Sequence, residues 1–511
     1  MLPAAIVPDL MAQIARVQKL HAQDLAAGYG PMVLALPIIA LCWLCGTGFA
    51  PDSGIDPSPR LPMTALAGEL SEAMQRFQHL FDPAAIDARQ AHGPATVYTP
   101  SVVVWLMVYQ RLHGNATLAA AVGELLRLTR ELPATALPAN RRIEEQTLSA
   151  STAAYSQART RFDGEVAEAF ADDVFGTLMT AMPPSWQNRR VFIVDGTTSK
   201  LASNEALRLL YPPASNQHGP GVWPILHWAV AHELASGCAV RPETGAMYGP
   251  NAVGEVALAV RLLQRIPAKS LLMADRNFGV FAFYYPAHQA GYDLVTRLTE
   301  ARFRSMVKSA KPDGPGRWTL LWKPTRADRK NHPELPADAA VRVVLHERIV
   351  TSPNGASQTL WLVTTLRSAD GESVATLYRH RLNVESDIRD VKVALQMENL
   401  RGRSAAMIAK ELAMGMVAYN LVVQIRRLAA QRIHVEPRRL SFTGVWSLVK
   451  TILLSPHDGT LEDYESKFDA VLRWAGQRKL PNRPGREYPR TVLPRGRKFP
   501  NRARKVEVAT P

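Results

Sequence analysis

Apolar residues between positions 63 and 172 recur at intervals of three and four, which is the spacing of one buried face of an α-helix. The pattern covers residues 66–80, 102–112 and 118–128, and no strand-like alternation interrupts it. Residues 52–62 are rich in Pro, Ser and Gly, which is typical of a linker. The chain therefore predicts a helical domain over residues 62–172.

The hydrophobic pattern changes after residue 189 to short continuous runs, which are typical of strands buried on both faces of a sheet. The runs lie at residues 191–194, 225–230, 238–240, 271–274 and 292–298, with helical spacing at 254–266 and 278–289. Three strands, a helix, a strand, a helix and a strand are the order of a ribonuclease-H-like α/β core. We expect the first part of such a core over residues 189–299.

Strand-like runs separated by Pro and Gly turns fill the next segment, at residues 318–322, 341–350 and 358–365. Helical spacing returns at residues 373–397 and 405–430. The predicted fold class is α/β: a ribonuclease-H-like catalytic core with a β-rich insertion, preceded by a helical N-terminal domain. The remaining predicted boundaries are 300–370 for the insertion, 371–435 for the second part of the core, and 436–511 for a C-terminal helical region with a basic arm.

The first 61 residues form an N-terminal extension that includes an uncharged stretch at residues 32–50. This stretch is about long enough to cross a bilayer. Pro37, Gly46 and Gly48 lie within it and no basic cluster lies beside it, so we do not expect a membrane partner. Met63 offers an alternative start, which would make residues 1–62 an upstream extension of the reading frame.

The 511-residue chain carries 60 Lys and Arg against 45 Asp and Glu, a formal charge of +15. Such an excess favours a polyanionic partner, with nucleic acid first and an anionic membrane surface second. Residues 478–505 hold eleven Lys or Arg, one Glu and five Pro, a composition that does not form a core. We expect a basic arm that contacts DNA phosphates; a merely solubilising tail is the alternative.

The three cysteines, at positions 42, 45 and 238, are too few for a disulfide framework in a chain of this length. A reducing, cytoplasmic location is therefore expected. Cys42 and Cys45 have the spacing of half a zinc site, but no second Cys or His pair lies nearby in the sequence.

Asp195 and Asp275 each end a continuous apolar run of the predicted sheet. Carboxylates at the ends of adjacent central strands meet at the edge where an open α/β sheet binds its ligands. Without a partner the two charges would repel and one would take up a proton, and a divalent cation between them removes that cost. Each residue also has a local alternative: Asp195 starts a turn before Gly196, and Asp275 caps the helix that follows.

The predicted helix at residues 378–397 carries Tyr378, Arg381, Glu385 and Lys392 at offsets of 0, 3, 7 and 14. At about 100° per residue, these four side chains fall within a sector roughly 60° wide. The sector lies beside an apolar stripe that should face the core, so Glu385 is placed to project toward the mouth of the sheet. An exposed helix with an Arg381–Glu385 ion pair is the alternative.

The two aspartates and Glu385 would together hold two divalent metal ions, Mg²⁺ or alternatively Mn²⁺. Two such ions activate the attacking oxygen and stabilise the leaving 3′ oxygen of a phosphodiester. Arg381 offers a bidentate fork to nearby phosphates and Lys392 offers a point charge. Tyr378 offers a hydroxyl donor and a stacking face.

At these residues the chain resembles the DDE transposases of bacterial insertion sequences, in the group with the signature Y-x2-R-x3-E-x6-K. Tyr378, Arg381, Glu385 and Lys392 match that spacing without a gap. The sequences around the two aspartates, VDGTTSKL and ADRNF, are also similar to those of this group. The resemblance covers roughly residues 62–505.

The resemblance implies a β-stranded insertion in the catalytic domain and an N-terminal helical domain that binds the element's terminal inverted repeats. It implies a homodimer that cuts the element out and pastes it into target DNA, so we expect a nucleoid-associated protein. The three carboxylates are expected as the catalytic metal ligands. Tyr378, Arg381 and Lys392 are expected as contacts to the double-stranded DNA.

Relatives in this group can pass through a DNA hairpin, helped by a tryptophan of the insertion that stacks on an extruded base. Trp322 is the expected equivalent and Trp318 the second choice. Packing inside the insertion is the alternative for either residue.

An Ala-rich segment just after residue 150 has outward positions at Gln157, Arg159 and Arg161, which suits a recognition helix in the DNA major groove. A solvated basic helix is the alternative. Glu255 opens a predicted helix, and we interpret it as complementing the helix dipole.

Two rival functions remain open from the sequence. A structure-selective DNA nuclease of the same fold would use the same metals without needing the spaced Tyr, Arg and Lys. An inactive DNA-binding remnant would need no carboxylate triad, and the three intact acids argue against it.

Overall fold

The computed structural model describes residues 82–131, 140–180, 182–217, 219–351, 357–453 and 470–481. The N-terminal extension with its uncharged stretch, the pair Cys42 and Cys45, and most of the basic arm at 478–505 lie outside these ranges. The predictions for those segments therefore stay predictions.

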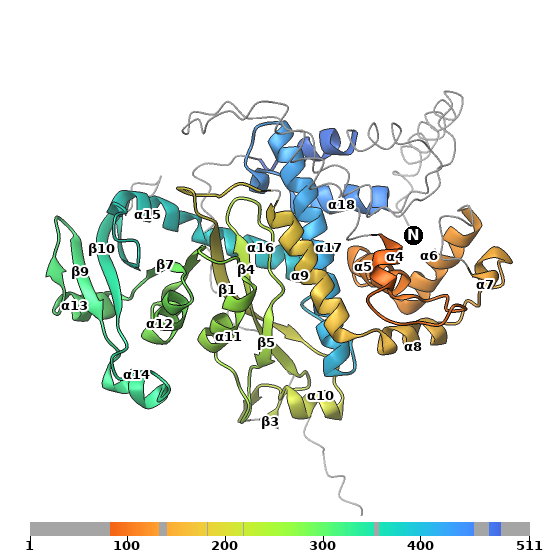
Figure 1. The fold of residues 1–511 in the computed structure, drawn as a ribbon, viewed down its shortest axis with the longest axis horizontal. Coiled ribbons are helices and arrows are strands. Elements are labelled where there is room, and N and C mark those ends of the chain that lie inside the picture. The colour runs from red at the N-terminus through yellow and green to blue at the C-terminus, as the bar shows by residue number, and fades with distance from the viewer. Residues whose placement is uncertain are drawn as a thin grey trace, which may run out of the picture.

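A nine-stranded mixed sheet forms the centre of the described chain, in the order β5-β4-β1-β6-β7-β11-β10-β9-β8 (Figure 1). β4 is antiparallel to both β1 and β5, whereas β1, β6 and β7 are parallel. Three antiparallel strands followed by two parallel ones are the topology of a ribonuclease-H-like core, so the predicted fold class is confirmed. The bounds are β1 Val191–Lys200, β4 Ile225–Glu233, β5 Glu243–Ala246, β6 Leu271–Ala274 and β7 Asp293–Arg297.

One predicted strand of this core is wrong. Residues 238–240 contribute only a single bridge, from His232 to Ala239, and the third strand is β5. The chain reverses tightly at Gly237, whose φ of 85° is in the left-handed region, and it pairs with β4 again only beyond Pro242. A small separate hairpin pairs β2 (Ser215–Asn216) with β3 (Gly219–Pro220).

The insertion is not a separate layer, because its strands continue the core sheet. β11 pairs antiparallel with β7, and β10, β9 and β8 follow outward. The three predicted strands are confirmed as β9 (Arg317–Trp322), β10 (Val341–Thr351) and β11 (Ser357–Thr364), with β8 at Lys311–Pro312. Two short helices were not predicted: α13 (Glu300–Val307), capped by Thr299, and α14 (Arg326–Asn331), which begins with a Thr325 and Asp328 capping box.

The helices predicted at residues 102–112 and 118–128 are present as α5 and α6, whereas the one predicted at 66–80 lies outside the described residues. The helices before the sheet share a core with it. A further helix, α9, continues to Thr180, past the predicted domain boundary at 172, and runs beside the long helix α17. The bounds are α4 Pro83–Asp87, α5 Pro100–Leu112, α6 Leu118–Glu131, α7 Arg141–Glu144, α8 Ala153–Arg161, α9 Gly164–Thr180, α10 Glu205–Leu210, α11 Glu255–Leu262, η3 Leu263–Arg265, α12 Phe281–Gln289 and α17 Ala405–Arg432.

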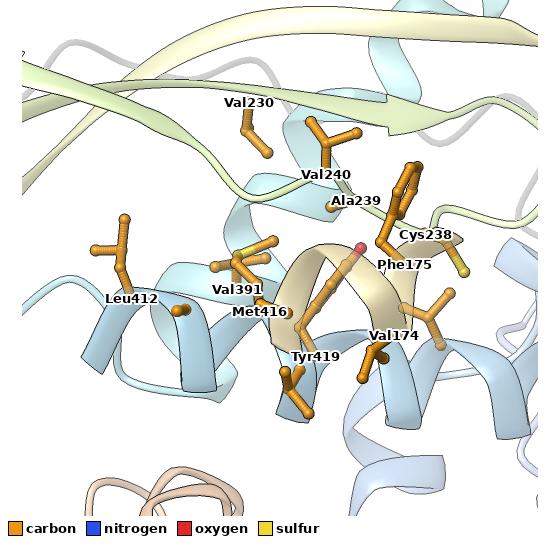
Figure 2. Close-up of a cluster of buried hydrophobic side chains, with 14 of the residues drawn as sticks. Val174, Phe175, Val230, Cys238, Ala239, Val240, Val391, Leu412, Met416 and Tyr419 are labelled. Carbon is orange, nitrogen blue, oxygen red and sulfur yellow. The ribbon is translucent and has the colours of Figure 1, made fainter. Parts of the chain in front are cut away.

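Figure 2 shows the centre of this shared core. Val174 and Phe175 of α9, Val230 of β4 and Met416 of α17 lie in one buried cluster. Among the described residues, α17 is the one helix long and apolar enough to cross a membrane, and 83% of its apolar window is buried inside the protein. It is packed between α9, α5 and α18 (Phe442–Leu453).

The helix predicted at residues 373–397 is present but changes its winding. It consists of α15 (Gly371–Arg379), a 3₁₀ turn η5 (His380–Leu382), α16 (Asn383–Arg389) and a π-helical turn η6 (Asp390–Ala394). The turn η7 (Pro437–Arg439) lies between α17 and α18. A fixed 100° per residue therefore does not hold between Glu385 and Lys392.

Candidate active site

The strand register places Asp195 and Asp275 next to each other. Val194 and Ala274 form the last pair of the parallel β1–β6 ladder, and the two aspartates are the next residue of each chain. The prediction that the strand ends at Asp195 is wrong, because β1 continues to Lys200 through its pairing with β4. It is the parallel pairing of β1 with β6 that ends before Asp195, so on its β6 side Asp195 has no paired strand residue.

Asp195 lies on the sheet face that is covered by α15 and α16. Ile193, two residues earlier, belongs to a buried cluster with Tyr378 and Val384. Alternate residues of a strand share a face. Asp195 therefore faces the helical segment that carries Glu385.

Arg381 connects two of the predicted ligands. Its Nη1 lies 3.6 Å from Asp195 Oδ2, and its Nη2 donates to Glu385 Oε1 at 2.7 Å. The ion pair four residues apart, which the sequence offered as an alternative, is thus formed, and the same guanidinium also reaches the sheet. The Asp195 and Arg381 side chains are 19% and 15% exposed, against 61% for Glu385.

Electrostatics at Asp195 disfavour its charged form. Burial raises the pKa of this carboxyl to about 6; the Gly196 N–H and Arg381 oppose the shift, and Glu255 and Asp275 add to it. An acid with neighbouring acids gains from a cation, which would remove both the burial cost and the repulsion.

The shift at Asp195 predicts how stability depends on pH in the absence of metal. The folded-state pKa of about 6 lies above the ordinary 3.8, so the stabilisation from this group is complete below pH 4 and is lost as the pH rises through 6. Asp195→Asn should therefore flatten the decline in unfolding free energy between pH 4 and 8, by on the order of 2 kcal/mol. Urea unfolding of both proteins across that range measures it.

Asp390 serves as an internal reference, because its pKa is also raised to about 6 and it is unchanged in both proteins. Added Mg²⁺ should stabilise the wild type above pH 6 and have less effect on Asp195→Asn. Parallel pH curves for the two proteins would contradict the assignment.

Asp275 also has the local role that the sequence allowed. Its carboxylate accepts from the Asn277 N–H at 2.7 Å and caps η4 (Arg276–Phe278). The turn then passes so close to β7 that a Cβ on Gly279 would lie 2.8 Å from the Arg297 carbonyl oxygen. The backbone contact, together with the cap, holds Asp275 at the end of β6.

Gly279→Ala should lower the unfolding free energy by about 1–3 kcal/mol, because the added methyl meets backbone that cannot move aside freely. The urea midpoint measures this change. Gly176→Ala is the control, since a Cβ there meets nothing within 4 Å and a helical Ala should be neutral or stabilising. Equal midpoints for the Gly279 variant and the wild type would show that the turn adapts without cost.

Tyr378 and Lys392 lie at the same edge of the sheet. Tyr378 is buried, and burial raises the pKa of its phenol to about 12, with Arg381 opposing and Asp275 adding to the shift, so the hydroxyl stays protonated at neutral pH. Lys392 Nζ donates to Thr197 Oγ1 at 3.1 Å, two residues beyond Asp195. All four residues of the helical signature therefore lie around the two aspartates.

Glu255 is a residue of this region that the sequence analysis undervalued. It occupies the first turn of α11, as a dipole-complementing residue would. A Cβ built on Gly196 would lie 2.2 Å from Glu255 Oε1, so the carboxyl group packs on the backbone beside Asp195. Burial raises the pKa of Glu255, and Asp275 adds to the shift. A glycine directly after the first Asp was the sequence signal that an outside group approaches there.

The acids provide the oxygen donors that Mg²⁺ prefers. As the side chains lie, no three His, Cys, Asp or Glu residues within the described ranges form a group that could hold a metal ion. The guanidinium of Arg381 stands between Asp195 and Glu385. The carboxylate donors fit a divalent cation. For Asp195 and Glu385 to bind the same cation, the Arg381 side chain would have to move from between them.

Of the two predicted tryptophans, Trp322 is buried and Trp318 is half-buried. Trp322 is 8% exposed, and its ring lies 5.1 Å from Tyr284 and 5.7 Å from Phe281, centroid to centroid. Trp318 packs edge-on against Phe303. These placements favour the packing role that the sequence left open over stacking on an extruded base.

The helix α8 has its outward arginines in different settings. Arg159 is nearly buried and forms an ion pair with Glu411 at 3.1 Å, so its charge is neutralised inside the protein. Arg161 is exposed. Of the two predicted DNA contacts on this helix, Arg161 alone presents its side chain to solvent.

Comparison with families, curated proteins and solved structures gives matches to transposases. Residues 186–421 match the family described as the transposase DDE domain. The chain is similar to the transposase InsG of insertion sequence element IS4 from Escherichia coli strain K12, with 23% identity over 458 residues that cover 88% of this chain and 96% of that protein. A solved piggyBac transposase synaptic complex with hairpin DNA matches with a TM-score of 0.37 and 8% identity, over 82% of this chain and 86% of that one.

Three features together define a polynucleotidyl transferase of the DDE class. They are the ribonuclease-H-like strand order, the two aspartates that directly follow the parallel β1–β6 ladder, and the match to the DDE domain. The matched segment and the relative are both transposases: residues 186–421 match a transposase DDE domain, and the chain is similar over 88% of its length to a transposase of a bacterial insertion sequence. Such enzymes bind DNA and generally use divalent metal ions.

Proposed function

We propose that this transposase cuts its element from donor DNA and joins it to target DNA, with Asp195, Asp275 and Glu385 as the catalytic residues. One observation carries the proposal: the Arg381 guanidinium contacts both Asp195 and Glu385, which are far apart in the sequence. The parallel ladder brings Asp275 to the same edge.

The three carboxylates would hold two Mg²⁺ ions, with Mn²⁺ as a substitute. The ions supply the charge that activates the attacking oxygen and stabilises the leaving 3′ oxygen. Arg381, once released from its carboxylates, and Lys392 would bind the phosphates of the scissile strand. Tyr378 would contribute a hydroxyl that stays protonated close to Asp275.

The partners follow from the family and from the charge of +15. The protein would bind the inverted repeats of its element, through the N-terminal helices that include the exposed Arg161, and would act as a homodimer on paired ends. It would work in the cytoplasm at the nucleoid. The basic arm would add salt-sensitive phosphate contacts.

The test uses the purified full-length chain, Mg²⁺, a precut element end and a target plasmid. We expect joining of the end to the plasmid, seen as a change of gel mobility, and no joining when EDTA replaces the metal. Cleavage of DNA without joining would point to the nuclease alternative instead. Binding of the end with neither reaction would identify an inactive remnant.

A further inference from the structure

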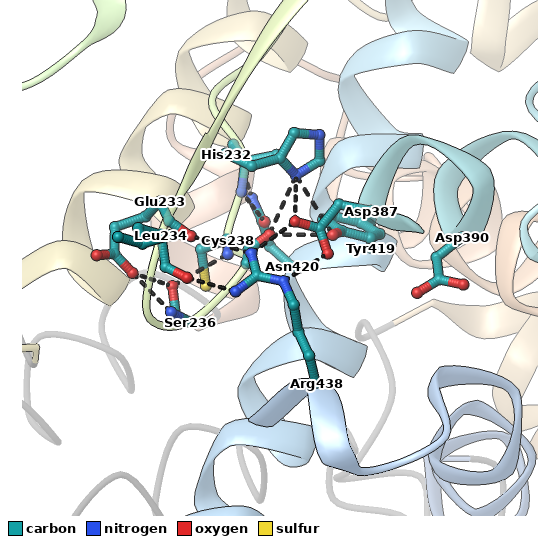
Figure 3. Close-up of polar contacts among 12 residues, drawn as sticks. His232, Glu233, Leu234, Ser236, Cys238, Asp387, Asp390, Tyr419, Asn420 and Arg438 are labelled. Atoms are coloured by element: carbon teal, nitrogen blue, oxygen red, sulfur yellow. Dashed lines mark hydrogen bonds and ion pairs between the residues drawn. The ribbon is translucent and has the colours of Figure 1, made fainter. Parts of the chain in front are cut away.

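Charged side chains are buried behind the segment that carries Glu385 (Figure 3). Asp387, two residues further along α16, is fully buried, whereas Glu385 is largely exposed. Residues two apart on a helix point to nearly opposite sides. Burial alone would raise the pKa of the Asp387 carboxyl, but Arg438, His232 and Arg426 hold its pKa below the ordinary value. An ionised carboxylate is therefore kept inside the protein by its partners.

Arg438 supplies the closest of these contacts. Its Nη2 donates to Asp387 Oδ2 at 2.6 Å and its Nε donates to Oδ1 at 3.1 Å, which is a bidentate fork. The same guanidinium donates to the backbone carbonyl groups of Glu233, the last residue of β4, and of Leu234. One side chain of η7 thus joins the sheet to the opposite side of the helix that carries Glu385.

Arg426 of α17 holds the next turn of the same segment. Its Nη2 lies 3.8 Å from Asp387 Oδ1, and its Nη1 lies 3.4 Å from Asp390 Oδ2. Asp390 is the first residue of the π-helical turn, which also carries Lys392. Turns of this kind are rare and are frequent at functional sites. The arginine therefore spans the point where the winding changes.

The rest of the network fixes the orientation of these groups. His232 lies 4.0 Å from Asp387, and Tyr419 of α17 donates to the Gly237 carbonyl oxygen at 3.0 Å. Figure 3 shows His232 of β4, Tyr419 of α17 and Arg438 of η7 around Asp387. A rotation of α16 would break contacts to all of these elements together.

Apolar packing already accounts for the attachment of this segment. Val384 and Val391 are fully buried against the sheet and against α17. A buried ion pair adds little net stability over a hydrophobic one, because desolvation offsets the attraction, and its best-attested use is to specify one arrangement. The directed fork of Arg438 specifies how the helix is rotated, which the valines alone do not.

We propose that Asp387 is a positioning residue for the catalytic reaction. Clamped by Arg438 and Arg426, it sets the rotation of α16 and thereby aims Glu385 at the edge of the sheet. The same clamp fixes the start of the π-helical turn, and so directs Lys392 toward β1. The inference rests on the proposed function, because it concerns the placement of a residue of that site.

The test compares the full-length wild type with Asp387→Asn, which keeps the side-chain shape and loses the charge. End binding should be retained, and joining should fall about 10-fold to 100-fold, as for other groups that orient a ligand. The Mn²⁺ concentration for half-maximal joining should rise. In the metal-free protein, amide hydrogen exchange of residues 383–394 should become faster while that of α9 does not.

Asp172→Asn is the matched control, since it breaks a bidentate Arg241 pair of 3.0 and 2.7 Å on α9. It should leave both the Mn²⁺ dependence and the exchange of residues 383–394 unchanged. Should Asp387→Asn not fold, Arg438→Lys keeps the charge without the fork and is judged by the same two measurements.

A folded Asp387 variant with wild-type exchange and wild-type Mn²⁺ dependence would overturn the inference, as would equal changes in the Asp172 control. The proposed function fails separately, if the wild type does not join DNA. The exchange measurement on metal-free protein tests the positioning role in either case.

Discussion

Glu385→Gln should reduce both strand cleavage and end joining roughly 1,000-fold or more, with nearly unchanged binding of the element end. Stabilisation of the reacting oxygens by metal charge is worth several kcal/mol, and each loss of about 1.4 kcal/mol is a factor of ten in rate. Gln retains an oxygen for the contact with Arg381, so the helix should keep its local packing. A joining assay with labelled precut ends, together with a mobility-shift assay on the same ends, measures the two effects.

Glu372→Gln is the matched control, since Glu372 is an exposed residue in the first turn of α15, on the same helical segment. It should join ends at the wild-type rate. Joining by Glu385→Gln within a factor of about ten of the wild type would remove Glu385 from the metal site. Loss of end binding in the same variant would instead indicate a folding defect.

The positions of the two aspartates could be predicted because a strand buried on both faces requires a continuous apolar run. Residues 191–194 and 271–274 are such runs, and each is fully buried. The register that brings Asp195 and Asp275 side by side could not be predicted, since it depends on how separate strands pair. The continuation of β1 to Lys200 depends on β4 in the same way.

Glu255 and Asp387 show what the pattern of the sequence cannot reveal. Charged residues are rarely fully buried, so a polar stretch such as ESDIRD reads as an exposed helix surface. Asp387 departs from that rule because its partners come from β4, α17 and η7, all distant in the sequence. Glu255 lies beside Asp195 only because α11 crosses the sheet at Gly196.

The predicted separation of an N-terminal domain has a similar origin. Helical spacing identifies buried faces but not what they are buried against. In the structure, α5 and α9 both pack on α17, which follows the predicted Glu385 helix in the sequence. The helices and the catalytic sheet therefore share one hydrophobic cluster.

Glu411→Ala should lower the unfolding free energy by about 3–5 kcal/mol, because it breaks a buried ionic group that joins these two regions. Glu411 of α17 is 7% exposed and lies 3.1 Å from Arg159 of α8 and 3.9 Å from Arg111 of α5. Burial lowers the pKa of Arg111 even beside its partner, and removal of Glu411 would leave that cation inside without a carboxylate. Urea unfolding followed by circular dichroism measures the change.

Glu145→Ala provides the comparison, since its pair with Arg141 is largely exposed and should be worth no more than about 0.5 kcal/mol. A single shifted transition for Glu411→Ala would mean that α5, α8 and the catalytic core unfold together, as their shared cluster implies. Two separate transitions, with only the first shifted, would contradict this and would support an independent helical domain. A change below about 1 kcal/mol would show that water reaches Arg111 and Arg159 once the carboxylate is gone.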